Sequence, residues 1–107
     1  MQNDGRRICN VFDRHIVLSE MDREFIEGLR QWLKDKYSDS TVTAVCGGVK
    51  KLLYYNITVD ELKTKHISDI YEAMFSKPIT RKNRSRWSWI RSLYFDYLEH
   101  LDDIDKH

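Results

Sequence analysis

The sequence is poor in the residues that interrupt helices or staple loops together. Its 107 residues include one proline, four glycines and two cysteines. Cys9 and Cys46 lie far apart, and Cys46 falls within an apolar stripe, so neither a disulfide framework nor a zinc knuckle is indicated. We therefore expect a protein of a reducing compartment, with no metal and no cofactor.

Long apolar runs and targeting signals are missing as well. No apolar run approaches the length of about 18 residues that a transmembrane helix needs. The N-terminal stretch MQNDGRRICNVF lacks the apolar region of a signal peptide. We expect a cytoplasmic protein that has no membrane partner.

The motifs of common enzymes are absent too. The sequence contains no H-E-x-x-H, C-x-x-C, G-x-x-x-x-G-K-[ST] or G-x-S-x-G. Glu20, Asp22 and Glu24 fit the first turn of a helix, where the helix dipole favours acids. The histidines are scattered, and a solvated acidic tail accounts for EHLDDIDKH without a metal ion. We predict neither an enzyme nor a small-molecule substrate.

What the sequence does contain is a series of apolar stripes at helical spacing. The strongest stripe runs from Val42 to Leu53 and includes Cys46. Thr58 and Glu61 form a capping box, and Pro78 separates the last helix from the rest. We predict helix starts at Ser19, Ser38 to Ser40, Thr58, Thr64 and Thr80. The inward residues of the last helix are expected to be Trp87, Ile90, Tyr94, Tyr97, Leu98 and Leu101.

These patterns predict an all-α protein, a small bundle of four to five helices in a single domain. Residues 1–18 have no clear period and form an N-terminal arm without assigned structure. The helical domain covers residues 19–101, and residues 102–107 form an acidic tail. Gly47 and Gly48 interrupt the strongest stripe. Either another helix crosses closely there, or the pair allows a close approach to a phosphate backbone.

Positive charge is concentrated in one segment although the net charge is only +1. Residues 77–91 contain six cations and no acid, whereas residues 96–106 contain five acids and one lysine. A basic first helical turn is unfavourable for the helix dipole and is explained by solvent exposure or by an anionic partner. Arg86 or Asn83 would then be placed to reach a base edge while neighbouring cations contact phosphates.

Trp87 and Trp89 are two positions apart on the last helix, so they face different sides. Trp87 fits the buried stripe. Trp89 is expected at the surface, where it either covers a neighbouring segment or marks an interface.

The order of these elements resembles the SAM-like core-binding domain of tyrosine recombinases and phage integrases. The resemblance covers roughly residues 23–98. It rests on three short motifs of that family, a helix start S-x-x-T, a passage l-x-x-I-T-x-x-x-I, and T-x-N-x-x-l-S-x-l-R opening an aromatic helix. The corresponding residues are Ser40, Thr41 and Thr43; Leu62, Thr64 and Ile67; and Thr80, Asn83, Trp87, Ser88, Ile90 and Arg91.

The resemblance implies a non-catalytic domain that clasps duplex DNA, because the cutting residues of this family lie in a separate C-terminal domain. Two departures are Trp87, where an aliphatic residue is usual, and the glycine pair. Nothing after Leu98 would house the catalytic domain. The chain would then be a fragment of a recombinase, a separate DNA binder, or a small regulator.

The leading hypothesis is therefore duplex DNA binding through the basic segment and the second helix. The alternative is a helical protein-interaction module, such as a regulator from a phage or mobile element, that docks on an acidic protein. Trp89 is a candidate interface residue under either hypothesis. The candidate DNA-binding residues are Thr41, Thr43, Lys50, Lys51, Lys77, Arg81, Lys82, Asn83, Arg84, Arg86 and Arg91.

Overall fold

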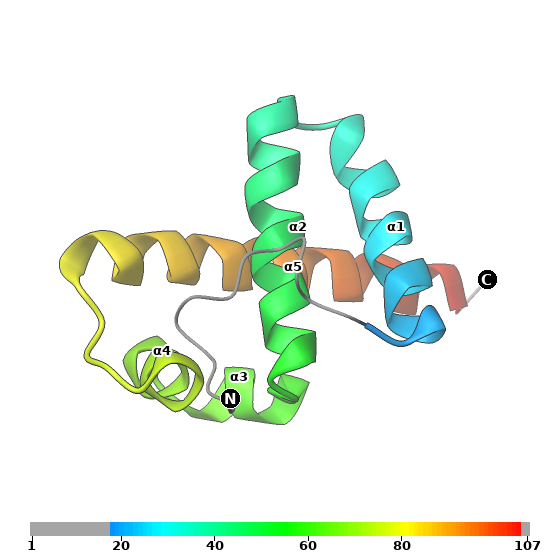
Figure 1. The fold of residues 1–107 in the computed structure, drawn as a ribbon. Coiled ribbons are helices and arrows are strands. Elements are labelled where there is room, and N and C mark those ends of the chain that lie inside the picture. Colours follow the sequence, from blue (N-terminus) through cyan, green and yellow to red (C-terminus); the bar gives the residue numbers. More distant parts are fainter. Residues whose placement is uncertain (1–17, 106–107) are drawn as a thin grey trace.

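The protein folds as a bundle of five α-helices, seen in a computed structural model that describes residues 18–105 (Figure 1). The helices are α1 (Glu20–Lys34), α2 (Asp39–Tyr54), α3 (Val59–Thr64), α4 (Ile67–Phe75) and α5 (Arg81–Asp105). No strand occurs in this part of the chain. The predicted all-α bundle is therefore confirmed. Residues 1–17 of the expected N-terminal arm lie outside the described residues.

Hydrogen-bonding side chains define most of the helix starts. Ser19 Oγ accepts from the backbone N–H of Asp22, and Ser38 Oγ accepts from that of Thr41. Thr58 and Glu61 form the predicted capping box. Thr80 Oγ1 accepts from the N–H of Asn83 at 3.2 Å, which caps α5. These four predicted starts are confirmed.

The predicted helix start at Thr64 is wrong. Thr64 is the last residue of α3, and its hydroxyl donates to the carbonyl oxygen of Asp60 at 2.8 Å. Lys65 is extended, and α4 begins after His66, which makes no side-chain cap. The threonine hydroxyl bonds backwards into its own helix, so it is not free to cap the next one.

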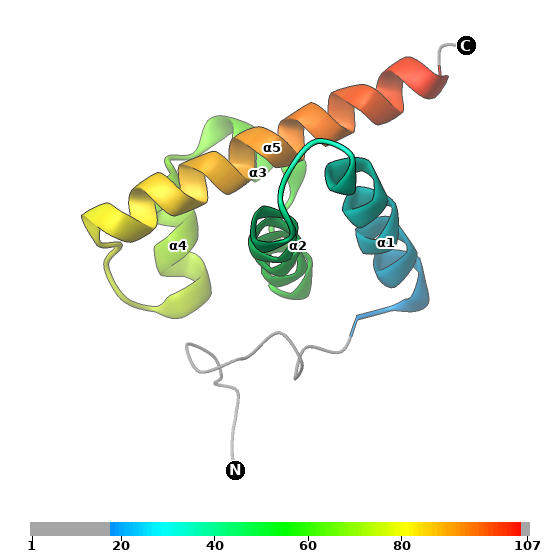
Figure 2. The same ribbon diagram turned by 90° about the horizontal axis from the view of Figure 1, so that it is seen from above.

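Helix α5 is the long element against which the others pack (Figure 2). Helices α1 and α2 form an antiparallel pair that stands across α5, α4 lies beside the first half of α5, and α3 lies beside its middle (Figures 1 and 2). The helix continues beyond the predicted end near Leu101, so residues 102–105 of the expected acidic tail are its last turn.

The core lies where the apolar faces of all five helices meet. Leu29, Val45, Val49 and Ile90 are almost fully buried. Some side chains differ from expectation: Leu53, Leu98 and Leu101 are only partly buried, whereas Leu93 belongs to the core. Within residues 18–105, none of the helices has both the length and the apolar character to span a membrane.

Helix α2 crosses α5 at Gly48. A Cβ atom added there would lie 2.8 Å from Cδ1 and 2.9 Å from Cγ2 of Ile90. The glycine therefore sets how closely the two backbones approach, which is the first of the two explanations considered for the pair. Gly28 of α1 leaves room for a side-chain tip further along α5, because its added Cβ would lie 2.6 Å from the hydroxyl of Tyr97.

Candidate nucleic-acid interface

A depression of about 250 Å³ lies where α2, α4 and the start of α5 meet. Its charged lining comes from three segments, with Lys51 on α2, Lys77 in the loop before α5, and Arg86 on α5. The remaining lining residues are Tyr71, Phe75, Asn83 and Trp87. Cations that are far apart in the sequence therefore surround one hollow.

A second depression of about 110 Å³ adjoins the first along the α2–α5 crossing. The two share Lys51, Arg86 and Trp87, and the second adds Thr43 with Ala44, Gly47, Gly48 and Ile90. No aspartate or glutamate of residues 18–105 lines either depression. We call the two together the α2–α5 basic depression. Five of the candidate DNA-binding residues line it: Thr43, Lys51, Lys77, Asn83 and Arg86.

Buried aromatic rings hold this surface in place. Trp87 is buried, and its ring centroid lies 6.1 Å from that of Phe75 on α4. Phe75 in turn packs against Tyr71, at 4.7 Å between centroids. Because Trp87 fixes the rotation of α5 about its axis, the neighbouring Arg86 is directed toward α2.

Asn83 connects α5 to α4. Its Nδ2 donates to the hydroxyl of Tyr71 at 3.1 Å, across twelve residues of sequence. Tyr71 is not among the candidate residues that the sequence indicated. No local pattern announces this contact, because the two residues meet only once α4 and α5 have packed. The donor group expected to reach a base edge is thus engaged within the protein.

The first turn of α5 adds positive charge beside the depression. Arg81, Lys82 and Arg84 are exposed, and the turn holds no acid. The partial positive charge of a helix start adds to these side chains. The region is therefore an electrostatic attractor for anions.

The remaining candidates lie elsewhere. Arg84 and Arg86 are two positions apart, so their side chains leave α5 about 200° apart around its axis. Arg91 lines a different depression, of about 420 Å³, together with Lys63, Ser88 and Phe95. The cations of the basic segment therefore lie on more than one side of the helix.

Two candidates on α2 also lie apart from the depression. Thr41 is held at the helix start, where its N–H donates to Ser38 Oγ at 3.4 Å. Lys50 lies one helical turn after Cys46. Its positive charge, together with that of Arg30, acts to lower the pKa of the Cys46 thiol. Burial is the larger effect and raises the pKa of Cys46. Trp89 is 39% exposed and lines none of the depressions described here.

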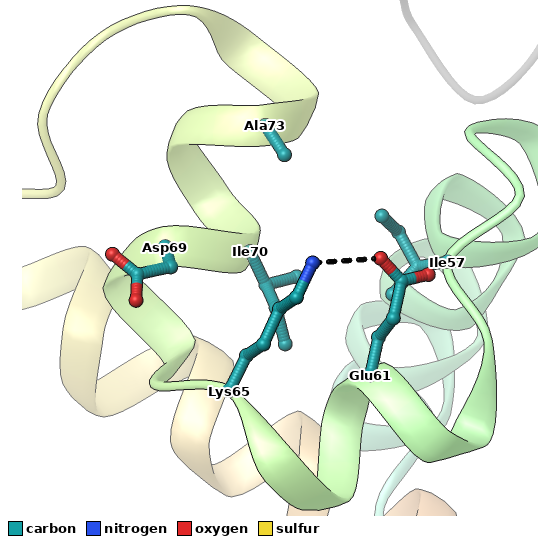
Figure 3. A pocket seen from close by; sticks show the side chains of 6 residues that line it. All are labelled: Ile57, Glu61, Lys65, Asp69, Ile70 and Ala73. Atoms are coloured by element: carbon teal, nitrogen blue, oxygen red, sulfur yellow. Dashed lines mark hydrogen bonds and ion pairs between the residues drawn. The ribbon is translucent and has the colours of Figure 1, made fainter.

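A depression between α3 and α4 has a different electrostatic character (Figure 3). It measures about 300 Å³ and is lined by Ile57, Glu61, Lys65, Asp69, Ile70 and Ala73. Lys65 Nζ reaches Glu61 Oε2 at 3.1 Å, and Asp69 adds a second carboxylate. Its one cation is already paired, so this hollow is a poor site for an anion.

His100, one of the four scattered histidines, is part of an aromatic stack. Its ring lies 5.6 Å from Trp32 and 6.1 Å from Tyr97 between centroids. Within the described residues, no three potential metal ligands gather into a group. Comparison with protein-family models, curated proteins and solved structures finds no match for this chain.

Proposed function

We propose that the protein binds duplex DNA without catalysis, through the α2–α5 basic depression. The observation that carries the proposal is the convergence of Lys51, Lys77 and Arg86 on one hollow without an acidic lining residue. Phosphate contacts of this kind supply most of the affinity of non-specific DNA binding.

Each lining group has a suitable role toward a phosphodiester backbone. Arg86 donates through a planar guanidinium, whose geometry matches two phosphate oxygens at once. Lys51 and Lys77 act as point charges on either side of it. The Thr43 hydroxyl adds a neutral donor, which positions the backbone without adding charge.

The resemblance to recombinase and integrase core-binding domains supports the same ligand. In the corresponding motif, Thr80 caps α5 and Asn83 ties the basic turn to Tyr71 of α4. The proposal assigns them to positioning the basic turn. We propose, as part of this function, that the chain belongs to that family of core-binding domains.

A salt titration with duplex DNA tests the proposal. Log K should fall with log salt at a slope of roughly −0.9 per phosphate contact, so three contacts predict a slope near −2.7. Arg86→Glu should lower the affinity and reduce the slope by about one contact.

Arg84→Glu is the matched control, because it makes the same charge change on the opposite side of α5. It should leave the slope close to that of the parent protein. If Arg84→Glu reduces the slope more than Arg86→Glu does, the site has been assigned to the wrong side of the helix. If the parent binds no duplex at about 50 mM salt, where such contacts are strong, the DNA proposal is wrong.

One observation favours the second candidate function, a protein-interaction module. Trp89 is 39% exposed, and tryptophan is enriched among the residues that dominate binding energy at protein interfaces. Its ligand would be an acidic protein that contacts the basic depression. Binding to such a protein in the absence of any affinity for DNA would support this candidate.

A further inference from the structure

The outward side of α5 carries a regular ridge. Its residues alternate in spacing between three and four positions, so they lie on one side of the helix. Every one of them is exposed. We define the α5 ridge as Lys82, Ser85, Trp89, Ser92, Asp96, Glu99 and Asp103.

Charge changes sign along this ridge. Lys82 stands at its beginning, and Asp96, Glu99 and Asp103 occupy its second half. Both ends of α5 oppose the helix dipole, since the first turn holds no acid and the last turn holds no base. An external surface with the reverse order of charges would compensate both ends.

The same ridge on a second copy has that order when it runs in the opposite direction. We propose that two copies of this chain associate through antiparallel α5 ridges, with the two-fold axis near Ser92. Lys82 lies ten residues before Ser92 and Asp103 lies eleven after it, so each lysine faces the aspartate of the second copy. Interfaces of this type are self-complementary, as two-fold symmetry requires.

The central residues fit this arrangement in size as well as charge. Trp89 lies three residues before Ser92 and Asp96 lies four after it, which brings each indole ring to the Ser92–Asp96 part of the second ridge. Ser92 is small and leaves room for the ring that comes from the second copy. Trp89 is therefore the apolar centre of the proposed interface, inside a polar rim.

A parallel arrangement is disfavoured by the same charges. It would set Lys82 against Lys82 and Asp103 against Asp103, and like charges across an interface oppose association. The direction of the pair is thus a specific part of the inference. Lys51, Lys77 and Arg86 lie outside the ridge, so the inference does not depend on DNA binding.

Sedimentation equilibrium of the full chain tests association. One tryptophan per copy and exposed ion pairs predict a weak dimer that dissociates as salt rises from about 50 to 500 mM, because salt screens exposed charges. Trp89→Ala should weaken the dimer about 30-fold, as expected for a central interface tryptophan. A protein that stays monomeric at low salt and high concentration would overturn the inference.

A charge exchange tests the antiparallel direction. Lys82→Glu alone should weaken the dimer, as should Asp103→Lys alone. The double variant should restore it, because each new glutamate then faces a new lysine of the second copy. Arg84→Glu, on another side of the helix, is the control and should leave the dimer unchanged. Failure of the double variant to restore association would overturn the antiparallel arrangement.

Cysteine scanning locates the two-fold axis independently of affinity. In a Cys9→Ser background, Ser92→Cys should form an intermolecular disulfide under mild oxidation, because position 92 meets itself. Ser85→Cys is the matched control. Two copies of position 85 would be about 21 Å apart from the helical rise, beyond the roughly 7 Å that a disulfide spans between Cα atoms. Equal cross-linking at the two positions would place the axis elsewhere.

Discussion

Another helix crosses each half of α5 at a glycine, but the two halves carry opposite charge. The first half, residues 81–91, is basic and meets α2 where Gly48 faces Ile90. The second half, residues 92–105, is mainly acidic and meets α1 where Gly28 faces Tyr97. In both cases the absence of a side chain on the crossing helix leaves room for a side chain of α5.

The two crossings differ in what meets the glycine. Ile90 offers Cγ2, a methyl group fixed directly to its β-carbon, so it has little room to yield. Tyr97 offers its hydroxyl, the far tip of a longer side chain. At the second crossing aromatic rings pack together. The ring centroids of Phe25 and Trp32 lie 5.5 Å and 5.3 Å from that of Tyr97. The half of α5 that carries the candidate DNA contacts is thus the half whose side chain at the crossing has less room to move.

The largest expected effect comes from emptying the first crossing. Ile90→Ala should lower the free energy of unfolding by about 2–4 kcal/mol, because it removes a buried side chain and leaves a cavity. Leu53→Ala should cost less, about 1–2 kcal/mol, since Leu53 is only partly buried. Urea denaturation measures both. Equal losses would mean that the crossing is not a special point of the core.

Filling the first crossing should also destabilise the protein. Gly48→Ala should cost about 1–3 kcal/mol through overpacking against Ile90, although alanine is the better helix former by roughly 1 kcal/mol. In the Ile90→Ala background the same change should be much less harmful, because the added methyl group enters the space left by Ile90.

The double-mutant cycle should therefore give a coupling energy of about 0.5–3 kcal/mol. Gly48→Ala combined with Leu53→Ala serves as the control cycle and should be closer to additive. Additivity in the Gly48–Ile90 cycle would contradict the close approach.

The second crossing should respond more weakly. Gly28→Ala brings a methyl group against the Tyr97 hydroxyl, which can move, so we expect a loss of about 1 kcal/mol or less. Tyr97→Phe removes that oxygen and should abolish the loss. Tyr94→Phe is the control, because its hydroxyl does not meet Gly28. Thermal denaturation of the four combinations decides whether the tyrosine tip sets this contact.

The smallest effect concerns alkaline pH. Burial raises the pKa of both Tyr94 and Tyr97 above the ordinary value near 10, and the charge of Asp22 adds to the rise at Tyr94. A raised folded pKa gives stability that is complete below the unfolded pKa and is lost as the pH rises through the folded value. Stability should therefore fall above about pH 10. The double variant with phenylalanine at both positions should lose less stability between pH 9 and 11 than the parent does.

Local sequence signals predicted most of the helices because their causes are local. Ser19, Ser38, Thr58 and Thr80 each cap with a backbone group three residues ahead, which a short window contains. The wrong prediction of a helix start at Thr64 also has a local cause. The Thr64 hydroxyl donates to the Asp60 carbonyl of its own helix instead of capping the next one.

Features that depend on packing were not predictable from those signals. Gly28 lies within an amphipathic helix and gives no local sign that a tyrosine 69 residues later will meet it. Leu93 was missed because the inward side of α5 is wider than one stripe once several helices cover it. Which of Arg84 and Arg86 faces α2 likewise required the rotation of α5, which the packing of Trp87 against Phe75 settles.

The order in which α5 is synthesised has a consequence for the cell. It is the last of the five helices to leave the ribosome, yet it covers apolar side chains of the other four. Until it emerges, the nascent α1–α2 pair exposes the faces around Leu29, Val45 and Leu52, which are among the most buried in the finished protein. We expect the bundle to fold only after α5 has left the ribosome, and the shorter nascent chain to be a chaperone substrate until then.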